Sequence, residues 1–138
     1  MRHSVSLRLL ALLPLLLSAC ASATAAPSPR VSFTGPADGA TVASPVHVKL
    51  AAENFIVEPA GAVKSGAGHL HIMVDTPCVA AGQVITKDAQ HVHYGQGQLE
   101  ADLELAPGAH TLCLQAADGA HTALSGDGLT QTINITVQ

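Results

Sequence analysis

The sequence predicts an all-β fold, an antiparallel β-sandwich of the immunoglobulin-like type with about six or seven strands. Three observations predict this fold. Apolar and polar residues alternate along several short segments, turns rich in Gly and Pro separate these segments, and no segment shows a sustained helical period. A small closed barrel is the alternative all-β architecture.

The predicted strands account for most of the chain after residue 30. They are the segments 31–34, 46–50, 69–75, 99–105, 109–116 and 130–137. The clearest is 99–105, in which apolar and polar residues alternate because every second side chain of a strand faces the core. The turn chemistry of Ala106-Pro-Gly108 predicts a hairpin between 99–105 and 109–116. Segments rich in turn residues are predicted loops: 54–68, 76–97 and 118–128.

Residues 1–19 predict an export signal. Arg2 and Arg8 flank the start of an apolar run, Leu9 to Leu17, that is too short to span a bilayer. The run ends in Leu17-Ser-Ala-Cys20, which resembles the lipobox of bacterial lipoproteins. This resemblance implies that Cys20 becomes the first mature residue and carries a lipid anchor. The alternative is an ordinary signal peptide that is cleaved near Ala25-Ala26.

Two regions follow the signal peptide. Residues 20–30 are the lipidated Cys20 and a flexible tether, because a segment of Ala, Ser, Thr and Pro cannot bury apolar surface. Residues 31–138 form the single β-sandwich domain. Because no Asp follows Cys20, the lipoprotein resemblance implies the bacterial cell envelope, at the periplasmic face of the outer membrane.

Composition limits the partners of the mature chain. From Cys20 onward, four basic residues stand against ten acidic ones, a formal charge of −6. The absence of a basic patch argues against nucleic acid as a partner. Membrane association is expected through the lipid on Cys20, and the sequence names no protein partner.

Cys78 and Cys113 are predicted to form one disulfide, because two cysteines of an exported domain most simply pair with each other. The alternative is that both thiolates bind a metal ion together with histidines. The oxidising compartment favours the disulfide.

Two His-x-His pairs are the most informative motif of the chain: His69-Leu-His71 and His91-Val-His93. On a strand, residues two apart point to the same face, so each pair can aim two ring nitrogens at one point. Neutral imidazole is the commonest metal ligand among side chains. We therefore predict a transition-metal site with His69, His71, His91 and His93 as ligands, and with Met73 and His121 as the next candidates.

Copper is favoured over zinc as the metal of this predicted site. The thioether of Met73 suits Cu(I), and imidazole suits Cu(II). Asp75, on the same strand face as His71, would instead suit zinc. The alternative to a metal site is a hydrogen-bonded histidine network that clamps the long loop 76–97 to the sheet, since imidazole both donates and accepts. His110 shares a face with apolar residues and is expected to be hydrogen-bonded at the core edge.

Several of these segments together resemble a bacterial family of exported proteins known as domain of unknown function 4399. The resemblance covers about residues 31–137, and it rests on the residues from Pro36 to Val46, Gly66 to Asp75, His91 to Glu100, Pro107 to Leu112, Asp118 and His121. It implies no activity. It does imply that the residues to study are His69, His71, His91, His93, His110 and His121.

An enzymatic function has little support in the sequence. The chain holds neither a Gly-x-Ser-x-Gly nucleophile elbow nor a His-Glu-x-x-His motif. Copper–zinc superoxide dismutases are similar in being exported β-sandwiches with a His-x-His pair and one disulfide. Their guiding arginine has no evident counterpart, because Arg30 is the only arginine after the signal peptide. We predict metal binding or delivery without turnover and identify no catalytic residue.

Overall fold

The computed structural model describes residues 26–138. The predicted signal peptide and the lipidation site Cys20 lie outside the described residues. Nine strands make up the domain: β1 (Arg30–Gly35), β2 (Thr41–Val42), β3 (Val46–Glu53), β4 (Ile56–Val57), β5 (Ala67–Val74), β6 (His91–Tyr94), β7 (Glu100–Leu103), β8 (Gly108–Ala117) and β9 (Thr130–Val137). Within residues 26–138, no helix has the length and apolar character that a membrane crossing requires.

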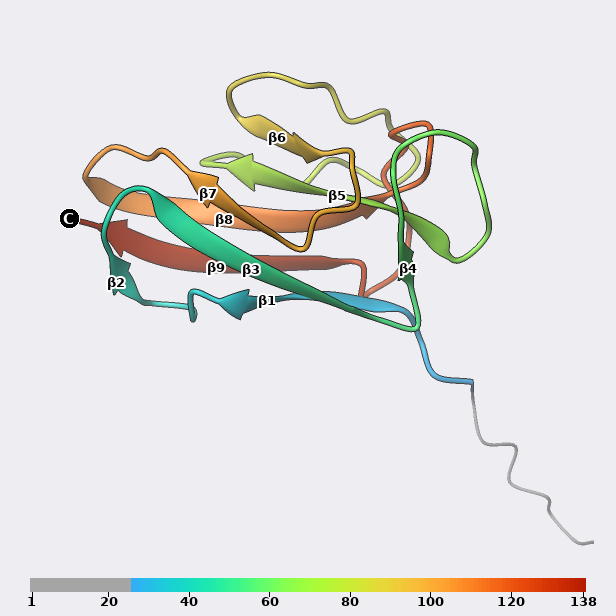
Figure 1. Cartoon of the computed structure of the whole chain (residues 1–138), viewed down its shortest axis with the longest axis horizontal. Coiled ribbons are helices and arrows are strands. Elements are labelled where there is room, and N and C mark those ends of the chain that lie inside the picture. Colours follow the sequence, from blue (N-terminus) through green and yellow to red (C-terminus); the bar gives the residue numbers. More distant parts are fainter. Residues whose placement is uncertain (1–25) are drawn as a thin grey trace, which may run out of the picture.

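The strands form two sheets that lie one over the other (Figure 1). The smaller sheet has the order β1-β3-β7. The larger sheet has the order β2-β9-β8-β5-β4, and β6 also pairs with β5. The prediction of an all-β sandwich is therefore confirmed, and seven of the strands have four or more residues.

The first strands connect the two sheets. β1 pairs antiparallel with β3 in the smaller sheet, whereas β2 pairs parallel with β9 in the larger one. The chain changes sheets between them, in the turn Pro36–Ala40, where the backbone N–H of Gly39 donates to the carbonyl of Asn134. The C-terminal part of β9 is thereby paired along its outer edge.

The main hydrophobic core lies between the sheets. β3 shows why the alternating pattern predicts it: Val46, Val48 and Leu50 are buried, and His47 and Lys49 between them are exposed. The inward residues of β5, β8 and β9 face this row. Burial of such aliphatic side chains contributes about 1.5–3 kcal/mol each.

β5 differs from the other strands because both of its faces are buried along its whole length. Leu70, Ile72 and Val74 belong to the core between the sheets. The opposite, outer face is covered by the connection from β5 to β6. Met73 lies there in a second hydrophobic cluster, together with Ile85 and Cys113.

Covalent and polar contacts hold this connection on the sheet. Cys78 forms a disulfide with Cys113 of β8, with 5.6 Å between their Cα atoms, as predicted. The buried side chain of Gln115 accepts from the backbone N–H of Val79 at 2.9 Å and donates to its carbonyl at 2.7 Å. Further along, the N–H of Ile85 donates to the carbonyl of His121. These contacts therefore hold the connection from β5 to β6 in place over the outer face of the larger sheet, and we call this connection the cover.

Two local predictions were wrong. Segments 99–105 and 109–116 do not form a hairpin, because β7 pairs with β3 in the smaller sheet and β8 pairs with β5 and β9 in the larger one. The turn at Ala106-Pro-Gly108 instead joins the two sheets. The predicted loops 54–68 and 76–97 contain the short strands β4 and β6, which pair with the edge of β5 that β8 leaves free.

The double variant Cys78→Ser/Cys113→Ser tests the anchoring of the cover. We expect the free energy of unfolding to fall by about 2–4 kcal/mol, because the disulfide closes a loop of 35 residues. Urea unfolding measures this loss. Hydrogen exchange should quicken in residues 78–90 and stay slow in β8 and β9. Unchanged exchange in 78–90 would contradict the anchoring role.

Candidate metal centre

Two strands place three histidines on the outer face of the larger sheet. His69 and His71 occupy alternate positions of β5, so both side chains point away from Leu70 and the main core. β6 runs antiparallel to β5, and its His93 stands directly opposite His71. Register and alternation therefore bring these three imidazoles together.

A loop supplies the fourth imidazole. His121 adopts a left-handed backbone conformation, with φ of 67°. The Asp118 carboxylate stabilises this turn, because its Oδ1 accepts from the N–H groups of Ala120 at 2.8 Å and Thr122 at 2.9 Å. Left-handed residues other than Gly are uncommon and cluster at functional sites.

Gly95 makes room for the His93 ring. A Cβ atom at position 95 would overlap Cε1 and Nε2 of His93, so any side chain there would displace the imidazole. Gly95 itself is buried. The sequence requires glycine at this position because the ring packs on its Cα.

The four rings converge on one another. Nε2 of His69 lies 3.0 Å from Nε2 of His71 and 3.1 Å from Nδ1 of His121. The His93 ring centroid lies 4.8–5.0 Å from the centroids of the other three rings. One nitrogen from each ring lies within 4.8 Å of those from the others. We call His69, His71, His93 and His121 the four-histidine cluster.

This spacing fits one transition-metal ion. Nitrogens bound at about 2.0–2.1 Å stand about 3.4 Å apart in a tetrahedron, and at most about 4.2 Å apart in any geometry. The cluster spans separations from 3.0 Å to no more than 4.8 Å, around the tetrahedral value. The widest separation lies above the limit of about 4.2 Å, so the rings would have to move closer together for all four nitrogens to bind one ion.

Hydrogen bonding leaves the cluster unsatisfied. A neutral ring nitrogen makes one in-plane hydrogen bond, yet Nε2 of His69 faces two other nitrogens. Nδ1 of His69, Nδ1 of His71 and Nε2 of His93 are buried and have no partner. Each such group costs about 1–3 kcal/mol. The nitrogens face one another, with no backbone carbonyl or amide as partner, so the loop-clamp interpretation is not favoured.

The environment keeps the imidazoles of His69, His71 and His93 neutral. Burial, and then the neighbouring His121 and His93, lower the pKa of His69 to about 4. Burial, and then the three other histidines of the cluster, lower the pKa of His71 to about 3. The pKa of His93 is also lowered, first by burial and then by His121 and Lys87. Neutral rings carry the free lone pairs that a metal ion needs.

A cleft connects the cluster to the surface. Its volume is about 340 Å³, and it is lined by His71, Ile85, Lys87, His93 and His121. His69 is fully buried behind these residues. A metal ion could therefore reach the cluster from the side of the β5–β6 connection.

The structure places two predicted ligands outside the cluster. His91 follows the same face of β6, opposite Met73, and its Nδ1 lies 2.8 Å from the Asp88 carboxylate. Met73 packs among the apolar residues of the second cluster and has no exposed surface. The structure thus brings together four of the six predicted ligands. One of the four is His121, which the sequence had placed behind the two His-x-His pairs.

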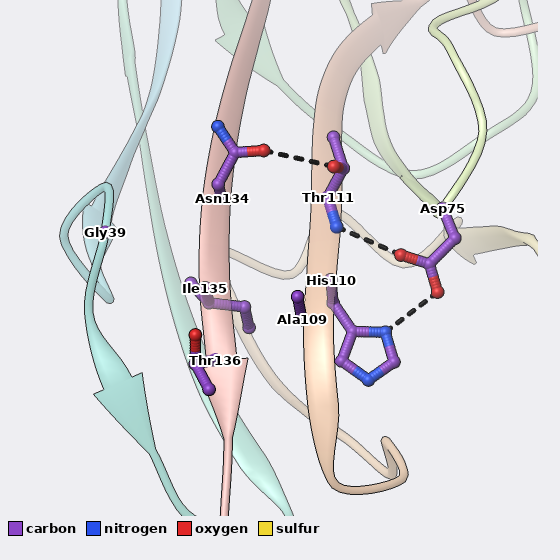
Figure 2. Close-up of a pocket in the computed structure, with 8 residues that line it drawn as sticks. All are labelled: Gly39, Asp75, Ala109, His110, Thr111, Asn134, Ile135 and Thr136. Carbon is purple, nitrogen blue, oxygen red and sulfur yellow. Dashed lines mark hydrogen bonds and ion pairs between the residues drawn. The ribbon is translucent and has the colours of Figure 1, made fainter.

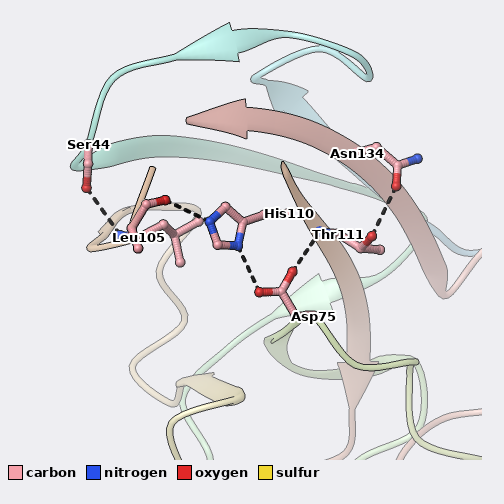
Figure 3. A network of polar contacts seen from close by, with 7 residues as sticks. Ser44, Asp75, Leu105, His110, Thr111 and Asn134 are labelled. Carbon is pink, nitrogen blue, oxygen red and sulfur yellow. Dashed lines mark hydrogen bonds and ion pairs between the residues drawn. The ribbon is translucent and has the colours of Figure 1, made fainter. Parts of the chain in front are cut away.

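Asp75 and His110 form a separate pair at the far end of β5 (Figure 2). His110 Nδ1 donates to Asp75 Oδ2 at 2.8 Å, and the N–H of Thr111 donates to Oδ1 at 3.0 Å. Figure 3 shows the surrounding polar network, in which His110 Nε2 also donates to the Ala106 carbonyl at 2.8 Å. The Ala106 carbonyl and the Asp75 carboxylate raise the pKa of His110. As predicted, His110 is hydrogen-bonded at the core edge, and Asp75 is engaged there, away from the cluster.

The sequence pattern missed the residues that support the cluster. Gly95, Asp118 and Gln115 carry no metal-site signature, because their contributions depend on contacts between distant segments. Asp118 offered one signal: an Asp in a predicted loop commonly accepts from the backbone N–H two residues on, as Asp118 does from Ala120.

One comparison with known proteins found a relationship. The family model described as "Domain of unknown function (DUF4399)" matches residues 48–138, a range that includes all four histidines of the cluster. The match begins within β3, so it does not extend to the opening segment 31–47. No curated protein and no solved structure matches the chain.

The low pKa values predict a pH-dependent stability of the metal-free protein. In the unfolded chain, both His69 and His71 take up protons near the ordinary pKa of 6.5, whereas in the folded chain they do so only near 4 and 3. Between these limits the unfolded state binds more protons, so the free energy of unfolding falls as the pH falls from about 6.5 to about 4. Urea unfolding across this range measures the slope.

The variant His69→Gln/His71→Gln is the comparison for this slope. It lacks both imidazoles, so its stability should depend less on pH between about 4 and 6.5, whatever its absolute value. Asp75 and Asp88 have lowered pKa values, so the stability that they contribute is lost below this window. Equal slopes in the two proteins would contradict the assigned protonation states.

Proposed function

The chain belongs to the DUF4399 family, and we propose that it binds a transition-metal ion through its four-histidine cluster. The proposed role is binding or delivery of the metal in the bacterial cell envelope, without turnover. Copper is favoured over zinc.

One observation carries this proposal: four imidazoles from three separate segments aim nitrogens at one another, and Nε2 of His69 faces two of them. A fold selected for stability alone would satisfy these buried groups or replace them with apolar residues, since unsatisfied buried polar groups are destabilising. A cation bound at the facing nitrogens of His69, His71 and His121 would accept their lone pairs in place of these nitrogen–nitrogen contacts. Metal binding therefore accounts for an arrangement that is unfavourable without it.

The ligand set supports copper through the affinity order of divalent ions. An all-imidazole site suits copper, zinc, iron and nickel, and Cu²⁺ binds most tightly among first-row ions. The packing of Met73 in the second hydrophobic cluster removes the thioether argument for Cu(I). The preference for copper thus rests on Cu(II).

The envelope location rests on the N-terminal sequence. Leu17-Ser-Ala-Cys20 supports a lipid anchor on Cys20 at the periplasmic face of the outer membrane. The disulfide between Cys78 and Cys113 agrees with an oxidising compartment, where such bonds persist. A superoxide-dismutase-like activity gains no support, because Arg30 lies in β1 of the other sheet.

The matched variants His93→Ala and His91→Ala test the proposal. Both residues lie on the same face of β6, yet only His93 belongs to the cluster. Competitive titration of the purified protein with Cu(II), Cu(I) and Zn(II) should give one tight equivalent for the wild type. Loss of a residue that only hydrogen-bonds a metal ligand weakens metal affinity by about 10–100-fold. His93→Ala removes a ligand itself, so it should weaken metal affinity by more than that. His91→Ala should bind nearly as the wild type does.

Two outcomes would contradict the proposal. Folded wild-type protein that binds none of these ions tightly would leave the cluster without a metal function. Equal losses in both variants would show that the site does not depend on the four-histidine cluster. Tighter binding of Zn(II) than of Cu(II) would overturn the copper preference alone.

A further inference from the structure

Lys87 stands at the cleft that leads to the four-histidine cluster. It is exposed, and it lines the cleft with His71, His93 and His121. Its charge reaches the site, because it contributes to the lowered pKa of His93. Among residues 26–138, the only lysine paired with a carboxylate is Lys64, which contacts Glu58 at 2.8 Å. Lys87 therefore directs a positive charge toward the site.

The charges around a bound metal ion do not balance. Four neutral imidazoles compensate none of the charge of a divalent cation, and none of the residues that line the cleft is acidic. The nearby Asp118 carboxylate raises the pKa of His69, so its single negative charge reaches the cluster, but it can offset only one of the two charges of a divalent ion. A divalent ion would thus carry uncompensated positive charge in a partly buried pocket, where charges are normally paired, with the exposed Lys87 beside it.

We infer that the cleft holds a small anion that binds the metal ion and pairs with the Lys87 ammonium group. This inference rests on the proposed metal function and names the co-ligand of the same site. The chemical class is a small carboxylate or inorganic oxyanion, since the cleft of about 340 Å³ admits only a small molecule beside the rings. With such a co-ligand, the protein would bind the metal ion and the small anion together.

The Cu(II)-loaded protein provides the test, in a buffer without coordinating anions. Azide is the probe, because its binding to Cu(II) gives a charge-transfer band and changes the electron paramagnetic resonance spectrum. Acetate, bicarbonate and inorganic phosphate are then added separately to displace it, which distinguishes a carboxylate from an oxyanion. Lys87→Gln should weaken azide binding by about fivefold, and Lys87→Glu by more.

A second readout separates this role from structural damage. Without azide, Lys87→Gln should bind Cu(II) at least as tightly as the wild type, because Lys87 repels a bare cation. Lys64→Gln is the matched control, since Lys64 is an exposed lysine outside the cleft, and it should change neither affinity.

The outcomes distinguish the two proposals. Absence of Cu(II) binding would overturn both. Tight Cu(II) binding with a spectrum that azide does not change would overturn the anion inference and leave the metal function standing. Azide binding of equal affinity in the wild type and Lys87→Gln would remove Lys87 from the site.

Discussion

The structure depends on the burial of both faces of β5. This strand pairs with β8 along one edge and with β4 and β6 along the other, so both of its edges are paired in the larger sheet. Its inner face packs in the sandwich core, as in any such fold. Its outer face would normally meet water, but here the β5–β6 connection covers it. His69 and His71 are consequently held where solvent cannot satisfy their rings.

The cover explains how a stable fold can carry an unfavourable cluster. The disulfide to Cys113 and the hydrogen bonds of Gln115 fix the start of the connection, and the Ile85 N–H ties it to the loop of His121. These contacts lie beside the histidines and do not involve their rings. The scaffold therefore positions the imidazoles with their nitrogens directed at one another, a preorganisation that favours binding.

Much of the fold follows from local patterns. The alternation in β3 and β9 identified each strand and its buried side, because every second side chain of a strand faces the core. In β5 the alternation identified the strand, but both of its faces are buried. The partner of each strand was harder to predict. The turn after β7 looks like a hairpin turn, yet β7 joins the smaller sheet, since pairing is decided by long-range packing that a short turn does not encode.

The candidate site divides in the same way. The His-x-His spacing indicated that His69 and His71 share a face, and the register of β6 then brings His93 beside them. The same His-x-His spacing wrongly predicted His91 as a member of the site. Its neighbour on the adjacent strand is Met73, and its ring contacts Asp88. Loop closure places His121, and no strand period could have ranked it above His91.

X-ray absorption spectroscopy of the zinc-loaded protein tests the central claim most directly. Zinc bound by the four-histidine cluster should show three to four nitrogen or oxygen scatterers at about 2.0–2.1 Å, with the outer-shell pattern of imidazole. A sulfur scatterer at about 2.3 Å, or fewer than three imidazoles around the ion, would contradict the account.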